Sequence, residues 1–169
     1  MTHRDRVLPE VKKFLNTHAV NGWKVLEVGH GYREDFKVLF KNNDMAYTAI
    51  DRDKVADKRD YEVFGMMEDM RMFKDKEFDL IFCCHAFEHC EHPIEALKEF
   101  KRVCKKFIFI ITPNYCSKQI TEGDIDHIFV LTDMQMAKLF NYLNISHHIY
   151  NTENSRVADI DLITIGDLS

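Results

Sequence analysis

The chain has 169 residues, of which 46% are hydrophobic and 30% are charged, a balance typical of one soluble globular domain. A formal net charge of -5, with acidic and basic residues interspersed, argues against nucleic acid as the default partner. No segment reaches the roughly 18 consecutive apolar residues of a membrane span, the polar start lacks the apolar core of a signal peptide, and five cysteines without framework spacing favour a cytoplasmic protein with free thiols.

Apolar residues recur at helical or strand spacing along the chain. Two helix starts carry specific signals, because Pro93 suits a first helical position and Thr132 with Gln135 forms a capping-box pattern. In chain order we expect a helix at 4–18, a strand at 23–28, a helix at 33–41, a strand at 45–50, a short helix or loop at 54–60, strands at 61–66 and 78–84, a helix from 93, a strand at 107–111, a helix from 132, and strands at 145–150 and 158–165.

Strands that alternate with helices predict an α/β fold, with a doubly wound, mostly parallel sheet of seven strands and helices on both faces. The short connection 151–157 predicts that the last two strands form an antiparallel closing hairpin. We expect a single domain over 1–169, made of an N-terminal helix (1–20), a cofactor-binding half (21–112) and an acceptor-side half (113–169). Ligands of such folds bind at the carboxyl ends of the strands.

The first of these strand ends carries a glycine turn, in the run Val25-Leu26-Glu27-Val28-Gly29-His30-Gly31. Glycines there let the backbone come close to a ligand, because a Cβ would collide with it. Asp51 closes the next apolar run, and its carboxylate can accept hydrogen bonds from a ribose hydroxyl pair. A third glycine at position 34 is missing, and the chain has no triphosphate-binding loop. The pattern therefore predicts the front half of a nucleotide-type cofactor site.

Several segments in succession resemble the motifs of the class I, Rossmann-like S-adenosylmethionine-dependent methyltransferases, in particular the group that acts on small molecules. The resemblance covers roughly residues 20–165 and depends on the order and spacing of the segments. They are Val25–Gly31, Ile50-Asp51, Gly65-Met66-Met67-Glu68-Asp69-Met70, Phe78-Asp79-Leu80-Ile81-Phe82, the stretch from His85 to Pro93, Glu99-Phe100-Lys101-Arg102-Val103, and Asp126-His127-Ile128-Phe129 before the capped helix.

The resemblance implies that the chain binds S-adenosylmethionine and releases S-adenosylhomocysteine. By position, Glu27 with the Gly29 and Gly31 backbone would face the methionine moiety, and Asp51 would hold the ribose. The residues implied near the adenine are Met67, Glu68, Asp69 and Met70, and those implied beside the methyl group are Cys84 and His85.

The predicted reaction is methyl transfer to an O, N or S atom of an unidentified acceptor, more consistent with a small molecule than with nucleic acid. An acceptor that must lose a proton needs a base, for which histidine is suited near neutral pH. His127 is the first candidate, followed by His89 and His85. The segment 113–131 and the N-terminal helix are short acceptor walls, so the site is expected to be open, for a large acceptor or for completion by a protein partner.

Three alternatives remain beside this prediction. Arg33 replaces a frequent third glycine and Met66 a frequent aspartate of the family, which favours a binding module that holds the cofactor or a partner without catalysis. An NAD-dependent oxidoreductase shares the glycine turn, but Glu27 stands where those folds usually keep an apolar residue. His85 and His89 with nearby cysteines are compatible with zinc, yet Glu88-His89 also matches family members without metal, so no metal is expected.

Overall fold

The structure is a computed structural model that describes residues 3–31, 34–53, 59–114, 131–152 and 160–169. It contains all seven predicted strands in the predicted order. The elements are α1 (His3–His18), β1 (Lys24–Val28), α2 (Asp35–Asn42), β2 (Ala46–Asp51), β3 (Glu62–Phe64), β4 (Phe78–Cys84), the 3₁₀ turn η1 (Phe87–His89), α3 (Pro93–Val103), β5 (Cys104–Pro113), α5 (Asp133–Tyr142), β6 (Ser146–Asn151) and β7 (Asp161–Asp167).

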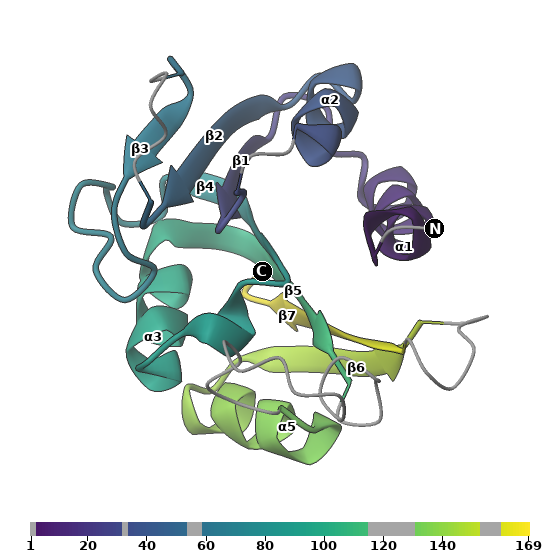
Figure 1. The fold of residues 1–169 in the computed structure, drawn as a ribbon, viewed down its shortest axis with the longest axis vertical. Helices are drawn as coiled ribbons and strands as arrows, with labels where there is room; N and C mark the ends of the chain where they lie inside the picture. Colours follow the sequence, from purple (N-terminus) through teal and green to yellow (C-terminus); the bar gives the residue numbers. More distant parts are fainter. Residues whose placement is uncertain (1–2, 32–33, 54–58, 115–130, 153–159) are drawn as a thin grey trace.

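The strands form one sheet in the order β3-β2-β1-β4-β5-β7-β6, which confirms the predicted doubly wound fold (Figure 1). Strands β1 to β5 pair in parallel, and β7 runs antiparallel to both of its neighbours, β5 and β6. The predicted closing pair is therefore present, but β7 lies inside the sheet and the edge strand β6 runs in the same direction as β5. Pairing with β5 over the whole of β7 fixes this arrangement, from Phe107↔Asp167 to Pro113↔Asp161.

Several element boundaries differ from the sequence prediction, among them the start of β5. Strand β5 begins at Cys104, directly after α3, although Lys105 and Lys106 suggest a loop. The ammonium of Lys106 lies 4.3 Å from the centre of the Trp23 ring and 3.3 Å from an Asp79 carboxylate oxygen. A charged residue is thereby accommodated at the start of a strand by an aromatic ring and a carboxylate. The turn η1 was not predicted from the sequence at all.

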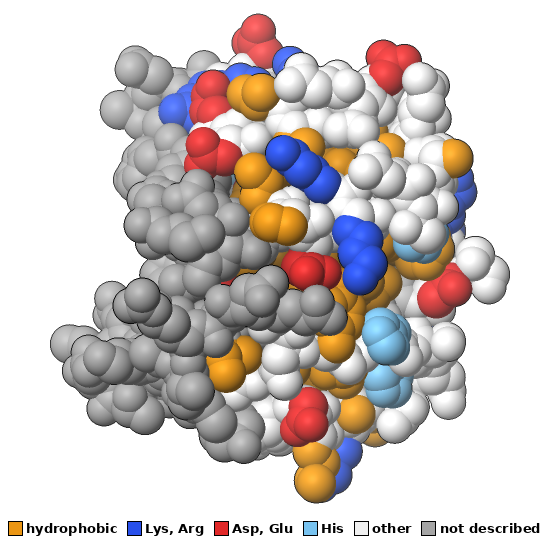
Figure 2. All heavy atoms as spheres, turned by 90° about the vertical axis from the view of Figure 1, so that its right-hand side faces the viewer, with side chains coloured by type: hydrophobic (Ala, Val, Ile, Leu, Met, Phe, Trp, Pro, Cys, Tyr) orange, Lys and Arg blue, Asp and Glu red, His pale blue; other side chains and the backbone are white. Residues whose placement is uncertain are grey.

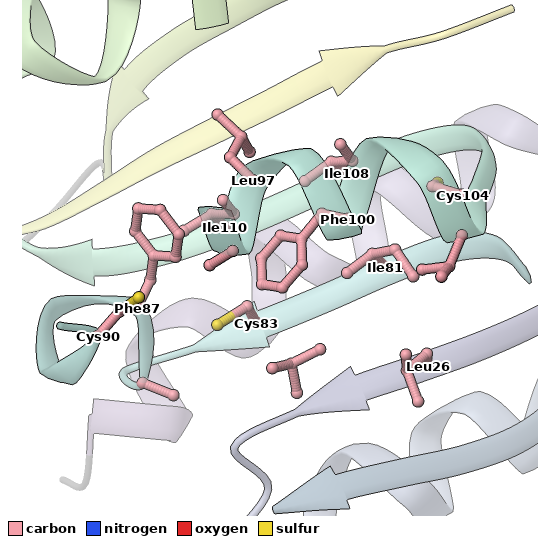
Figure 3. Close-up of a cluster of buried hydrophobic side chains, with 14 of the residues drawn as sticks. Leu26, Ile81, Cys83, Phe87, Cys90, Leu97, Phe100, Cys104, Ile108 and Ile110 are labelled. Atoms are coloured by element: carbon pink, nitrogen blue, oxygen red, sulfur yellow. The ribbon is translucent and has the colours of Figure 1, made fainter. Parts of the chain in front are cut away.

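Helices cover both faces of the sheet and enclose two apolar cores. The helices α1 and α2 pack on one face, where Phe36 and Phe40 contact Phe82 of β4. On the other face lie η1, α3 and α5, with Phe87 and Phe100 beside Cys83 (Figure 3). Neighbouring residues of β4 thus point into opposite cores, as expected for a central parallel strand.

The described cysteines Cys83, Cys84, Cys90 and Cys104 are buried free thiols, as predicted; Cys116 lies outside the described residues. Burial raises the pKa of Cys104 to about 11, so this thiol stays protonated near neutral pH. Within the described part of the chain, no helix combines the length and the apolar character that crossing a membrane would require.

Arg102 of α3 holds the loop between β3 and β4 in place through hydrogen bonds. Its guanidinium donates to the carbonyl oxygens of Met70 (2.9 Å) and Phe73 (3.0 Å), and to carboxylate oxygens of Glu99 (2.7 Å) and Asp75 (2.8 Å). Glu99 in turn accepts a 2.8 Å hydrogen bond from the Met70 backbone N–H. The hydrogen bonds from Arg102 hold the pKa of the Glu99 carboxyl below its usual value. One side chain therefore ties both the backbone of this loop and its Asp75 carboxylate to α3.

We expect Arg102→Ala to lower the free energy of unfolding by roughly 2–4 kcal/mol, because two loop carbonyls and Glu99 lose their donors. Urea denaturation followed by circular dichroism measures the loss. Lys98→Ala is the control on the same helix, since its exposed pair with Glu95 at 3.8 Å should contribute about 0.5 kcal/mol or less. Equal losses in the two variants would show that Arg102 has no special anchoring role.

Candidate functional site

A cavity of about 550 Å³ lies at the carboxyl ends of β1, β2 and β4, where the fold was expected to bind its ligand. It also borders the segment after β3 and the turn η1. The predicted site residues that line it are Gly29, Gly31, Asp51, Met67, Glu68, His85 and His89.

The glycine turn is held against the end of β2. The Gly29 N–H donates to the Ile50 carbonyl at 2.9 Å, and the Gly31 N–H donates to Asp51 Oδ2, also at 2.9 Å. The other Asp51 oxygen accepts from the Asp53 N–H at 3.0 Å. The carboxylate therefore lies on the cavity wall with its position set by two backbone donors.

Gly29 and Gly31 are required for different reasons, and the sequence alone predicted one reason for both. Both have positive φ, +69° at Gly29 and +60° at Gly31. A Cβ on Gly29 would overlap the Ala86 side chain, so this glycine allows two protein segments to pack. A Cβ on Gly31 would meet no protein atom within 4 Å. Both glycines line the cavity, but only at Gly31 would a side chain extend into open space, so the expected close approach of a ligand applies there.

Glu68 is fixed on the opposite wall by hydrogen bonds to the segment after η1. Its Oε1 accepts from the Cys90 thiol at 3.1 Å and from the Glu91 N–H at 3.2 Å. Burial, followed by the hydrogen bond to Glu68, raises the pKa of Cys90, so the thiol remains protonated and serves as a donor. The loop that follows β3 is therefore bonded to the cavity wall formed after β4.

His85 occupies a strained position where β4 ends. Its φ of 51° lies in the left-handed region, which a non-glycine residue rarely adopts. Its Nε2 lies 3.0 Å from Asp161 Oδ1 and its Nδ1 lies 3.6 Å from Glu88 Oε1. Both carboxylates are almost completely buried, whereas the imidazole is 18% exposed. The histidine ring is therefore the accessible member of a buried acid–histidine–acid group at the cavity.

Sequence reasoning missed the two acids of this group. Glu88 stands three residues after His85, a spacing that could have suggested a contact. Asp161 comes from β7, so only the sheet order brings it to the end of β4. Another missed contact joins His30, between the two glycines, to Glu62 of β3.

Four predicted cofactor residues do not line the cavity. Glu27 is buried and accepts a 2.7 Å hydrogen bond from the Tyr47 hydroxyl. Asp69 is paired with Arg71 at 2.8 Å, and Met70 and Cys84 belong to the two apolar cores. These residues are not among those that line the cavity, and their predicted contacts with the cofactor stay predictions.

Arg33 and the first base candidate His127 lie outside the described residues, as do residues 54–58 and most of the predicted acceptor wall 113–131. Within the described ranges, no group of three or more His, Cys, Asp and Glu side chains is arranged to hold a metal ion.

The charges around the cavity are predominantly acidic. Asp51, Asp53, Glu68 and Glu91 line it, and among the described lining residues Arg52 is the one Lys or Arg side chain. Carboxylates at a concave surface favour a positively charged ligand. The arrangement therefore suits a ligand that combines hydroxyl donors with a positive charge.

Comparison with known proteins gives a family match. The family model for a methyltransferase domain matches residues 26–110, which is half of the chain. This range holds the glycine turn, Asp51, the loop with Glu68, and His85. No curated protein matches the sequence.

Solved structures share the fold at low sequence identity. A SAM-dependent methyltransferase from Archaeoglobus fulgidus is 18% identical, with a TM-score of 0.77 over 96% of this chain and 94% of that one. The 1,6-didemethyltoxoflavin-N1-methyltransferase of Burkholderia thailandensis, solved with 1,6-didemethyltoxoflavin and S-adenosylhomocysteine, is 13% identical, with a TM-score of 0.72 over 94% of this chain and 76% of that one. A methyltransferase in complex with the Trm112 activator of Haloferax volcanii is 14% identical, with a TM-score of 0.69 over 98% and 93%.

We expect Gly29→Ala to destabilise the protein and to distort the cavity wall, because the new methyl group overlaps Ala86. Gly22→Ala is the matched control, since Gly22 also has a positive φ, +75°, but has open space around its Cβ position. The additional loss in Gly29→Ala should be about 1–3 kcal/mol in urea denaturation. If both variants lose the same stability, the contact with Ala86 does not explain the glycine.

Proposed function

Since this chain belongs to the methyltransferase domain family, we propose that it transfers a methyl group from S-adenosylmethionine to an O, N or S atom of a small molecule. Membership of the family makes it an S-adenosylmethionine-dependent enzyme of the Rossmann-like class, as predicted from its motifs. The identity of the acceptor and the roles of individual residues are the proposed part.

The observation that carries the proposal is the fixed Asp51 carboxylate beside the open space at Gly31. A ribose hydroxyl pair could donate to this carboxylate, as expected for an acid at the end of the second strand. The acidic lining suits the sulfonium and ammonium charges of the cofactor. Met67 and Glu68 border the same cavity on the side where the adenine is expected, and a thioether packs well on an aromatic ring.

We assign the acceptor side of the cavity to His85. S-adenosylmethionine, when bound, supplies a methyl group that its sulfonium makes electrophilic, so the enzyme mainly has to position the acceptor. An acceptor that gives up a proton needs a base within hydrogen-bond distance. The Nε2 atom of His85 is buried against Asp161, so the proposed proton acceptor is Nδ1, and Asp161 with Glu88 would orient the ring and offset the positive charge that it gains. His89 lines the cavity as well, and His127 stays a prediction.

The proposal of a small acceptor has two supports. On the face shown in Figure 2, Lys and Arg side chains are separated by acidic and apolar ones rather than gathered into a basic stripe, which does not favour nucleic acid. In addition, the similar Burkholderia thailandensis enzyme was solved with a small acceptor, 1,6-didemethyltoxoflavin.

A protein partner that completes the site also stays a prediction. Large apolar side chains are exposed next to the cavity, with Phe64 57%, Met66 48% and Met72 45% accessible. Exposed apolar side chains that lie together are typical of contact surfaces. The similar Haloferax volcanii methyltransferase was solved in complex with an activator protein, which supports the same idea.

We expect Asp51→Ala to abolish detectable binding of S-adenosylhomocysteine in titration calorimetry, because the ribose loses its acceptor. Asp60→Ala is the matched control, since it removes the same charge from an exposed position before β3 and should bind like the wild type. Unchanged affinity in Asp51→Ala would refute the placement of the ribose.

We expect His85→Asn to lower methyl transfer by about 100-fold or more, with little change in affinity for S-adenosylhomocysteine. The assay separates the small molecules of a cell extract by chromatography and follows labelled methyl from S-adenosylmethionine into compounds other than the cofactor. His92→Asn, an exposed histidine before α3, is the control. Transfer by His85→Asn at the wild-type rate would exclude it as the base, and label found only in macromolecules would contradict a small acceptor.

A further inference from the structure

A buried histidine–glutamate pair lies behind the glycine turn, in a place that the proposed reaction does not use. His30 stands between Gly29 and Gly31, and its Nε2 is 2.9 Å from Glu62 Oε1. The two side chains are 1% and 8% exposed. Because an ionised carboxylate can only accept, the imidazole N–H donates, and the bond is charge-assisted. The turn is therefore bonded to β3, which is the edge strand of the sheet.

A second contact joins the same two parts of the chain. Glu34, just before α2, accepts a 2.6 Å hydrogen bond from the hydroxyl of Tyr61, which precedes β3. It also accepts from Lys37 at 3.1 Å and lies 3.3 Å from an Arg59 guanidinium nitrogen. The hydrogen bonds from Tyr61 and Lys37 hold the pKa of Glu34 below its usual value. The segment that connects β1 to α2 is thus attached to β3 at both of its ends.

The position of this pair matters because both parts that it joins border the cavity. The glycine turn supplies Gly31 and the N–H that holds Asp51, while β3 leads directly into Gly65 and the loop with Met67 and Glu68. Strand β3 itself has only three residues and pairs with β2 alone. So short an edge strand gains its fixed position from side-chain contacts as well as from its ladder.

Stability alone is a weak reason for such a pair. Burying two ionisable groups carries a desolvation cost that their attraction often only offsets, and an apolar pair of similar volume would often be at least as stable. A buried hydrogen-bonded pair does, however, restrict the glycine turn to one position relative to β3, because any other position would break the hydrogen bond. The structure thus favours a role in positioning over a role in stability.

We propose that His30 and Glu62 are positioning residues for cofactor binding, which hold the glycine turn and the start of the loop after β3 at one fixed separation. This inference rests on the proposed cofactor site. The pair need not touch the ligand, since it acts through Gly31 with Asp51 on one side and through the loop with Glu68 on the other.

The test measures two quantities for each variant and for the wild type. Titration calorimetry gives the affinity for S-adenosylhomocysteine, and thermal unfolding gives the melting temperature. We expect His30→Ala and Glu62→Ala each to weaken binding by about tenfold or more, and the double variant to lose no more than either single variant. Glu62→Gln keeps the volume and an acceptor oxygen, so it should fold even if the alanine variants do not, and it should retain much of the affinity. Tyr150→Phe is the control, because it removes a 3.3 Å hydrogen bond to Glu10 from β6 at the opposite sheet edge.

The outcomes separate this inference from the proposed function. Tyr150→Phe should lower the melting temperature but leave the affinity unchanged. If His30→Ala and Glu62→Ala bind like the wild type, or if their losses in binding add up in the double variant, the positioning role is wrong while the cofactor site stands. If the alanine variants do not fold, the Glu62→Gln variant decides. Binding by Glu62→Gln that is no better than binding by Asp51→Ala would overturn the positioning role. Failure of the wild type to bind would overturn both.

Discussion

The burial of β4 on both faces is the constraint on which the rest of the fold depends. All of its residues except Asp79 are buried, and successive side chains such as Phe82 and Cys83 belong to opposite cores. A strand of this kind has to be covered on both sides, here by helices, and its neighbours β1 and β5 pair with it in parallel. Their carboxyl ends then meet at one edge, so the packing of the core decides where the cavity lies.

Local sequence patterns predicted the elements well where neighbouring residues in the chain determine the structure. The apolar run of β4 was predicted with its observed bounds, and the capping box of Thr132 and Gln135 is present with both hydrogen bonds. The neighbours of β7 are a different matter. A short connection before β7 favours antiparallel pairing with β6. The position of β7 between β6 and β5, however, depends on contacts between distant parts of the chain.

The candidate site divides in the same way. Gly31 and Asp51 were recognisable because a motif names both, and the structure joins them by a hydrogen bond. The pairs His30–Glu62 and His85–Asp161 were not recognisable, since each depends on which strands become neighbours. Glu27 is a different case, because its motif position suggested a contact with the cofactor, whereas the structure shows its buried carboxylate accepting a hydrogen bond from Tyr47, a partner that the sequence does not reveal.

The reversed direction of β7 has a consequence for how such a site can change. A parallel strand brings its last residue to the cavity edge, whereas an antiparallel strand brings its first, and Asp161 is the first residue of β7. The acid beside His85 is thus encoded far along the chain from the glycine turn and Asp51. Substitutions at the beginning of β7 can therefore change the surroundings of His85, the proposed base, while the residues proposed to hold the cofactor stay untouched. The two proposed ends of the site are thus encoded in separate parts of the chain.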